Sequence, residues 1–355
     1  MDKQTRIAQA FDLIQPDRPP ILGGWLAAPE HIQALTGCSP EEYWDDPWSW
    51  GVKAEHALGS DGVVTIFTPV SRGAYRCVDG RVLEERAAYT EARMLAEIEA
   101  MPEPDEIRAG FDEETAYAAF VAEFKHTQAQ LGDLVWAPAD WDLNPHALEY
   151  SRYGYENALT LTAAYPDHWL KLMRVKAERG RQRATLRARA IRAGLHPRAI
   201  LGGEDICTQR GPMVSPHLLR KYYFPLLEYI LEPLVAAGAR QVWHCDGDWR
   251  PILNDVIACG VGGLQGFQRE CGMELEWIVD LKTRWGDPLV IFGPMSVTRT
   301  LPYGAPEDVR AEVRHAMDIC RDKASLCIFT SNTITPDIPL HNVKTLWETV
   351  LNSRW

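Results

Sequence analysis

Eight short apolar runs recur along the chain, and a helical pattern follows each of them. Parallel strands need crossover connections, which are usually helical, and eight such strands are the number that closes a barrel. The chain has 355 residues, a length that α/β barrels reach as one domain. We therefore predict a single (β/α)8 (TIM) barrel domain over residues 1–355. The eight runs are 20–25, 62–67, 134–139, 199–204, 240–246, 262–267, 288–293 and 326–331.

Helical signals fill the gaps between these runs. Capped or amphipathic patterns cover residues 112–132, 215–238 and 305–320. Pro225 and Pro233 are expected to kink or divide the second of these helices. The connections after the second and third predicted strands are much longer than a minimal crossover. We expect them to hold extra helices and lid elements over the barrel mouth: 68–133 and 140–198.

The overall charge limits the classes of partner. A formal net charge of -12 argues against binding to nucleic acid or to an anionic membrane surface, since both favour clustered Lys and Arg. The basic run at 174–194 has its charges spaced around a helix, so we interpret it as a solvated helix face. No stretch offers the roughly 18 apolar residues of a membrane helix, and eight scattered cysteines are typical of reduced thiols. These features predict a cytoplasmic protein.

The run "VWHCDGDW" places polar residues where a barrel strand ends, which is where barrel enzymes carry their chemistry. Side chains alternate along a strand, so His244 and Asp246 point one way while Cys245 points the other. A His-x-Asp pair can bind a metal or transfer protons. The alternative is that Asp246 caps the next helix and His244 is an ordinary core residue.

Two further strand ends offer candidate groups. Glu204 and Asp205 follow two glycines that let backbone or ligand approach closely, and they form either a metal or acid–base site or a structural turn. Cys271 follows the sixth strand, and its thiolate is a possible third ligand of a zinc ion held by His244 and Asp246, although a lone cysteine is more often inert.

The remaining candidates concern substrate. Asn332 ends the last strand and can orient a carbonyl or carboxylate. The tryptophans are equally suited to a pocket wall and to core packing. The residues predicted to contact a small-molecule substrate are Trp25, Trp136, Trp141, Asp142 and Gln268.

Several stretches, in this order and spacing, resemble the superfamily of uroporphyrinogen decarboxylases and cobalamin/coenzyme M methyltransferases. They are "GGEDICTQRGPMVSPHLLRKYYFPLLEYI", "HCDGDWRPILNDVIACGVGGLQGF", "CGMELEWIVDLKTRWGDPLVIFGPMSV", "LPYGAPEDVRAEV" and "PDIPLHNV". The resemblance implies a (β/α)8 barrel. True decarboxylases resemble one another in an arginine-rich loop after the first strand, which here reads "GGWLAAPEH", and in a histidine where Asn332 stands. The resemblance therefore favours the methyltransferase-like branch.

That branch implies a zinc site with a His-x-Cys motif and a distant cysteine. His244 matches the histidine, while Asp246 and Asn332 stand where the two cysteines would be. Either the site has been rebuilt with Glu204, Asp205 or Cys271, or no metal is bound. The branch also implies cobalamin or another corrinoid as methyl acceptor. The corrinoid-carrying motif Asp-x-His-x-x-Gly is absent from "AEHALG" (54–59), so the acceptor is expected on a separate protein.

Three functions remain open at this point. The favoured one is a demethylase-type methyltransferase that moves a methyl group from a small, aromatic or otherwise apolar substrate to a corrinoid. The second is a metal-free decarboxylase or lyase in which His244 protonates a carbanion and Asn332 holds an oxyanion. The third is a barrel that binds a small molecule without turnover. The sequence leaves the substrate and the oligomeric state open.

Overall fold

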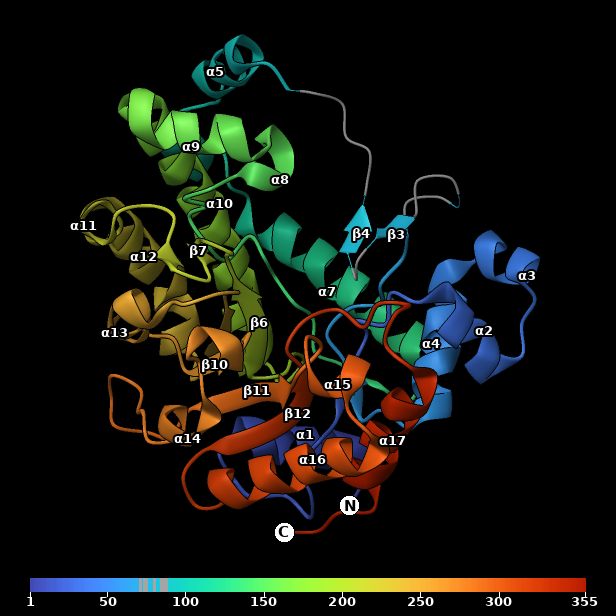
Figure 1. The fold of residues 1–355 in the computed structure, drawn as a ribbon. Coiled ribbons are helices and arrows are strands. Elements are labelled where there is room, and N and C mark those ends of the chain that lie inside the picture. Colours follow the sequence, from blue (N-terminus) through green and yellow to red (C-terminus); the bar gives the residue numbers. More distant parts are fainter. Residues whose placement is uncertain (70–71, 73–75, 79–80, 84–88) are drawn as a thin grey trace.

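The structure is a computed structural model that describes all residues except 70–71, 73–75, 79–80 and 84–88. Its core consists of two parallel sheets (Figure 1), so the predicted α/β fold is confirmed. Each predicted run contains or overlaps one strand. The first sheet has the order β1 (Leu22–Gly23), β2 (Gly62–Val63), β5 (Val135–Trp136). The second has the order β12 (Ser325–Thr330), β11 (Val290–Met295), β10 (Gly263–Gln265), β9 (Arg240–His244), β6 (Ala199–Gly203).

The two sheets adjoin along both of their outer strands. On one side, Ile328 N donates to Pro20 O at 2.8 Å, and Ile21 and Ile328 form a parallel bridge beside β1 and β12. On the other side, Asp140 N, just after β5, donates to Leu201 O of β6 at 2.7 Å. All eight strands therefore run in the same direction, and side chains from both sheets join one apolar cluster. The residues that follow their carboxyl ends lie on one face.

Alternation along the strands separates two apolar layers. The interior contains Val242 of β9 together with Leu201, Phe292 and Phe329. Trp243 and Cys245 pack in the outer layer beneath the helices. Helix α1 (Lys3–Phe11) lies at the amino ends of the strands, where its Phe11 stacks on Phe292 with ring centroids 5.7 Å apart. The predicted facing of the β9 side chains is thus correct.

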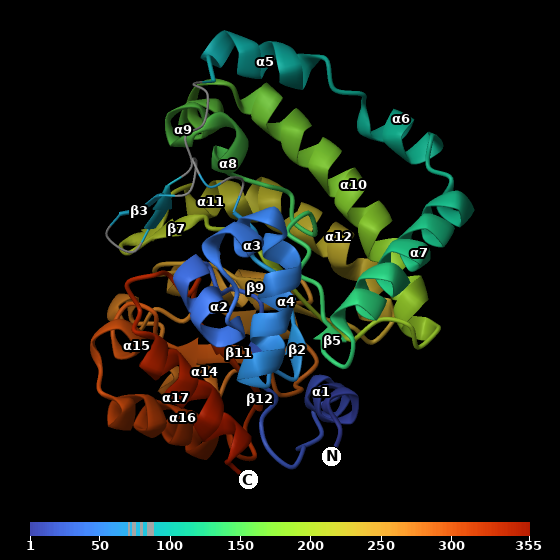
Figure 2. The ribbon, with the colours of Figure 1, turned by 90° about the vertical axis from the view of Figure 1, so that its right-hand side faces the viewer.

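The two long connections carry helices, as expected. Between β2 and β5 lie a short hairpin and three helices: β3 (Arg76–Val78), β4 (Arg81–Leu83), α5 (Glu91–Glu99), α6 (Pro104–Ala109) and α7 (Glu113–Leu131). Between β5 and β6 lie α8 (Tyr150–Tyr153), α9 (Tyr155–Ala164) and α10 (Pro166–Arg192). Figure 2 shows α5, α6 and α7 running along the outer side of α10, against which they pack. Part of the segment predicted to hold lid elements lies outside the described residues.

Shorter elements complete the fold. The helix predicted at 215–238 is divided by a π-helical turn just ahead of Pro225, which lies in the first turn of α12 (Phe224–Ala236). Pro233 lies inside α12 and does not divide it. No helix in the described part of the chain is long and apolar enough to cross a membrane. The remaining elements are α2 (Pro29–Thr36), α3 (Pro40–Asp45), α4 (Pro47–Leu58), β7 (Cys207–Thr208), β8 (Gly211–Pro212), α11 (Pro216–Leu218), a π-helical turn (Leu219–Tyr223), α12 (Phe224–Ala236), a 3-10 turn (Arg250–Ile252), α13 (Leu253–Ala258), a 3-10 turn (Arg269–Cys271), α14 (Leu275–Ile278), α15 (Thr300–Tyr303), α16 (Pro306–Cys320) and α17 (Leu340–Leu351).

The basic run on α10 is not simply a solvated face, which corrects the interpretation made from the sequence. Arg187 is only 6% exposed, and its guanidinium contacts Asp140 Oδ2 at 2.7 Å. Arg183 contacts Asp140 Oδ1 at 3.0 Å. Two of the arginines therefore hold α10 to the end of β5 through a buried carboxylate.

Candidate metal centre

Three potential metal ligands converge at the carboxyl ends of β6 and β9. These strands are neighbours with Gly203 opposite His244, so Asp205 and Asp246 follow side by side. His244 Nε2 lies 3.2 Å from Asp205 Oδ1, and the backbone N–H of Asp246 donates to the same oxygen at 2.9 Å. The ligand atoms of Asp205, His244 and Asp246 all lie within 4.8 Å of one another. We call these three residues the Asp205 cluster.

Glycine at position 203 makes this approach possible. Its φ of +140° is a conformation that side-chain-bearing residues rarely adopt, and a Cβ there would lie 2.1 Å from His244 O. The backbone of β6 therefore passes directly against the end of β9. Any larger residue at 203 would push Asp205 away from the imidazole.

Gln265 of β10 fixes the orientation of the imidazole. Its Nε2 donates to two backbone carbonyls, Thr330 O at 2.9 Å and Ser331 O at 3.0 Å. The amide oxygen consequently faces His244 Nδ1, which must carry the proton and donate it. This leaves Nε2 directed at Asp205. Sequence analysis missed Gln265, although it stands opposite His244 in the strand register and shares its face.

Two further side chains hold the carboxylates. Asn332 Nδ2 donates to Asp246 Oδ2 at 2.7 Å, and the Tyr150 hydroxyl donates to Asp205 Oδ2 at 3.3 Å. Asp246 Oδ1 is shielded from solvent and has no hydrogen-bond partner among the described residues. Asn332, which is predicted to orient a substrate carbonyl or carboxylate, thus contacts a carboxylate of the protein. Tyr150 carries no signal in the sequence.

The cluster is electrostatically unbalanced toward negative charge. Burial opposes protonation of His244, but the charge and hydrogen bond of Asp205, aided by Asp246, outweigh burial and raise the pKa of His244 to about 9. Burial likewise favours the neutral form of Asp205, yet the charge of His244 outweighs it and lowers the pKa of Asp205. Burial and the neighbouring Asp205 raise the pKa of Asp246 to about 6. One positively charged imidazolium therefore faces two carboxyl groups.

Aromatic rings form one wall of the site. Trp25 and Trp141 both meet the His244 ring edge-on, with centroids 5.9 Å and 5.6 Å away, and they stack on each other at 6.2 Å. Phe329 packs against Trp25 at 4.7 Å. Trp141 is 39% exposed and so lies at the mouth, whereas Trp25 lies deeper.

Two predicted substrate contacts are not brought to this wall. Trp136 points to the outer side of β5, where it packs with the apolar group that contains Leu131 and Leu134. Asp142 is half exposed and lies near His146, whose hydrogen bond lowers the pKa of Asp142 to about 2. Alternation places Trp136 on the opposite face of β5 from the apolar interior that contains Ala137.

The other predicted residues lie around the cluster without joining it. Glu204 accepts from Leu148 N at 2.7 Å, and burial raises its pKa. Gln268 Oε1 accepts from Gly247 N at 2.8 Å, which holds the loop that carries Asp246. The Cys271 thiol donates to Gln268 Oε1 at 3.5 Å, and burial raises its pKa. The Asp205 cluster therefore does not include this thiol.

Fold and site together define an α/β protein whose parallel strands present a histidine and two carboxylates at their carboxyl ends. The sequence matches the uroporphyrinogen decarboxylase (URO-D) family over residues 90–352, so the chain belongs to this family. The resemblance seen in the sequence is confirmed, and the family indicates an enzyme.

The comparison with solved structures supports the fold. A methyltransferase from Methanosarcina mazei matches with a TM-score of 0.61 and 17% identity, and the match covers 98% of each chain. At this identity the likeness concerns the arrangement of the chain. No curated protein matches the sequence.

Proposed function

We propose that this protein is a metal-dependent methyltransferase built as a single (β/α)8 domain over residues 1–355. In this proposal it moves a methyl group from a small, apolar or aromatic substrate to a corrinoid. The convergence of Asp205, His244 and Asp246 carries the proposal. The contacts between the sheets at both outer strands support a closed barrel, and the extra helices after β2 and β5 would border its mouth.

The residues present fit a zinc ion. Catalytic zinc sites use three protein ligands and leave a fourth position open. With metal–ligand bonds of about 2.0–2.2 Å, two ligand atoms of a tetrahedral site lie about 3.3–3.5 Å apart. The 3.2 Å between His244 Nε2 and Asp205 Oδ1 is close to this spacing. The unpartnered Asp246 Oδ1 supplies the third donor.

The chain's own residues prepare this site. Gln265 keeps the proton on Nδ1, so that the lone pair of Nε2 is available to bind the ion. This arrangement is common around metal-binding histidines. Asn332 and Tyr150 hold the Oδ2 atoms of the two carboxylates, and the Oδ1 atoms are the ones assigned to the ion. When bound, a zinc ion would supply Lewis acidity to the substrate heteroatom that carries the methyl group. Trp25 and Trp141 would position the substrate and limit the entry of water.

The corrinoid would be carried by a separate protein or be free in solution. The histidine of "AEHALG" is engaged elsewhere, since His56 Nε2 lies 3.1 Å from Leu131 O and its Nδ1 lies 3.3 Å from Asp133. This supports the view that the chain does not ligate a corrinoid through His56. Gln268 and Asp142 remain predictions as substrate contacts, as do catalytic roles for Glu204 and Asn332.

The first experiment is a zinc titration of metal-free protein, followed by elemental analysis. We expect one zinc ion per chain in the wild type and its loss in His244→Ala and Asp205→Asn. Asp248→Asn is the matched control, because Asp248 lies in the same loop but pairs with Arg250 at 2.8 Å. Cys271→Ala tests the predicted thiolate, and retained zinc would remove it from the ligand set.

A second assay tests the reaction itself. Methyl transfer from a methylated thiol or aryl methyl ether to reduced cobalamin can be followed by the change in corrinoid absorbance. We expect turnover in the zinc-loaded wild type and none in His244→Ala. Absence of zinc binding in the wild type would overturn the metal proposal and favour a metal-free decarboxylase or lyase. Binding of intact ligand without turnover would favour a binding protein.

A further inference from the structure

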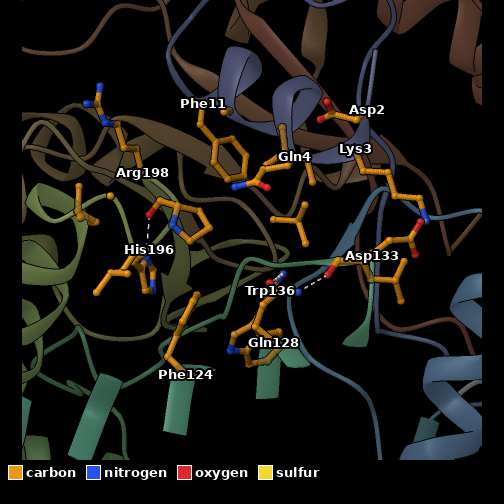
Figure 3. A pocket seen from close by; sticks show the side chains of 18 of the residues that line it. Asp2, Lys3, Gln4, Phe11, Phe124, Gln128, Asp133, Trp136, His196 and Arg198 are labelled. Carbon is orange, nitrogen blue, oxygen red and sulfur yellow. Dashed lines mark hydrogen bonds and ion pairs between the residues drawn. The ribbon is translucent and has the colours of Figure 1, made fainter. Parts of the chain in front are cut away.

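A second cavity opens at the opposite end of the strands from the Asp205 cluster. It encloses about 680 Å³ between α1, the end of α7 and the loop that joins α10 to β6. Figure 3 shows Phe11 of α1 on one wall and Phe124 of α7 on the other, with Arg198 beside them. We call this space the α1 cavity.

The α1 cavity lies where the two sheets are least joined. Among the described residues, β5 pairs with β2 and β6 pairs with β9, and the hydrogen bond from Asp140 N to Leu201 O connects the two near their carboxyl ends. The cavity is lined by 134–136, at the start of β5, and by 197–198, just before β6. It therefore occupies the gap between the amino ends of these two strands.

The walls of the α1 cavity are mainly apolar. They come from separate parts of the chain, so a molecule in the cavity would contact both sheets and α1 at once. A volume of this size falls in the range of about 300–1,000 Å³ that is typical of sites for small molecules. The principal apolar side chains are Ile7, Phe11, Phe124, Val135, Trp136 and Ile191.

Both cationic side chains at the rim of the α1 cavity are paired with carboxylates. Lys3 Nζ lies 3.1 Å from Asp133 Oδ2, and Arg198 Nη1 lies 3.0 Å from Asp12 Oδ1. Asp2 is engaged too, because its side chain caps α1 by accepting from Thr5 N at 2.7 Å. An anionic ligand would have to break one of these two ion pairs to gain a cationic partner.

The polar side chains deeper in the cavity are also occupied. Gln128 uses its oxygen to accept from Trp136 N and its nitrogen to donate to Leu134 O, both at 2.8 Å. His196 contacts Pro197 O through Nδ1 at 2.7 Å and the Arg187 guanidinium through Nε2 at 3.0 Å. These groups shape the walls but offer no free charge to a ligand.

We propose that the α1 cavity is a binding site for an uncharged, largely apolar small molecule with an aromatic or branched aliphatic body. Binding would be driven by burial of apolar surface against α1 and the starts of β5 and β6. Because such a ligand binds the folded chain across the junction of the two sheets, it would also stabilise the fold by mass action.

Two fluorescent probes that differ by one charge test the proposal. N-phenyl-1-naphthylamine is uncharged, and its 8-sulfonate derivative carries the same rings with a negative charge. We expect the uncharged probe to saturate at one per chain and to raise the unfolding temperature. The sulfonate should bind at least about tenfold more weakly, because its charge meets no free cation.

Two variants locate the bound probe. Ala8→Trp places a large ring at a position that lines the cavity, and Leu195→Asp adds a charge beside an opening where Leu195 is 38% exposed. Each should weaken binding of the uncharged probe about tenfold or more. Tyr303→Asp is the matched control, because Tyr303 is 82% exposed, belongs to α15 and does not line the cavity. Binding unchanged in both cavity variants, several probes per chain, or equal affinity for the sulfonate would overturn the proposal.

Discussion

Two acidic residues follow neighbouring strands and look alike in sequence, but their surroundings differ. Asp140 follows β5, and both of its oxygens contact guanidinium groups of α10, from Arg183 and Arg187. Asp205 follows β6 and faces one imidazole together with a second carboxyl group. The Asp140 group has two cations for one carboxylate, whereas the Asp205 cluster has one imidazole for two carboxyl groups.

The difference separates a carboxylate whose charge is fully paired from a group that can accept a further cation. A buried carboxylate with every oxygen paired has no capacity for another ligand, and it holds two elements together. The Asp205 cluster keeps Asp246 Oδ1 without a partner inside a shielded site, which leaves capacity for a cation. Counting donors and acceptors therefore distinguishes the two groups, while residue type and position do not.

The strongest test of this comparison is Asp140→Ala. We expect it to reduce the free energy of unfolding by about 3–5 kcal/mol, because it leaves the buried Arg187 without its partner. Asp205→Asn should cost less than about 1 kcal/mol in metal-free protein, since the imidazole can release its proton. Urea unfolding of both variants measures the difference. Equal losses of stability would show that the two groups are alike.

The second prediction concerns the Asp205 cluster alone. Gln265→Leu removes the acceptor that orients His244 and should lower zinc affinity about 10- to 100-fold. Gln182→Leu is the control, because Gln182 of α10 donates to Ile107 O at 3.0 Å and belongs to no contact of the cluster. Zinc titration of both variants decides the matter. An unchanged affinity in Gln265→Leu would mean that the orientation of His244 is unimportant for binding.

The third prediction is a pH dependence of stability that arises at His196, which contacts Arg187 of the Asp140 group. Burial and the charge of Arg187 lower the pKa of His196 from 6.5 to about 3. As the pH falls, His196 therefore binds a proton in the unfolded chain before it does so in the folded chain. The free energy of unfolding then decreases from about pH 6.5 toward pH 3. At pH 5 the loss is about 2 kcal/mol. His196→Asn should abolish this part of the decrease between pH 7 and pH 5. A decrease as large as that of the wild type would contradict the assignment.

The smallest expected effect comes from Tyr150→Phe. This change removes one hydrogen bond to Asp205, worth about 0.5–1.5 kcal/mol, and should weaken zinc binding about two- to tenfold. Tyr155→Phe is the control, since Tyr155 stacks on Tyr150 and keeps its ring after the change. A loss of more than about 100-fold in Tyr150→Phe would indicate a more direct role for this hydroxyl.

Local patterns predict the strands and the facing of His244, because apolar runs and alternation depend on nearby residues. The partners of the acidic groups come from distant segments. Arg187 lies 47 positions beyond Asp140 on a helix whose charges point in all directions, so its pairing carries no local signal. Gln265 sits in the glycine-rich run "GGLQGF", and only the register between β9 and β10 places it against the imidazole. Trp136 was assigned to the substrate although alternation turns it outward.

The division into two sheets has a consequence for how such proteins diversify. The three ligands, Gln265 and Asn332 all come from residues 205–332, on or next to strands of the five-stranded sheet. Trp25 and Trp141 come from loops after β1 and β5, the two outer strands of the three-stranded sheet. In the proposed function, ion coordination and the shape of the substrate wall would thus be encoded on separate lengths of chain. If the proposed function holds, relatives that change the loops around Trp25 and Trp141 would accept a different molecule and keep the same metal-binding residues.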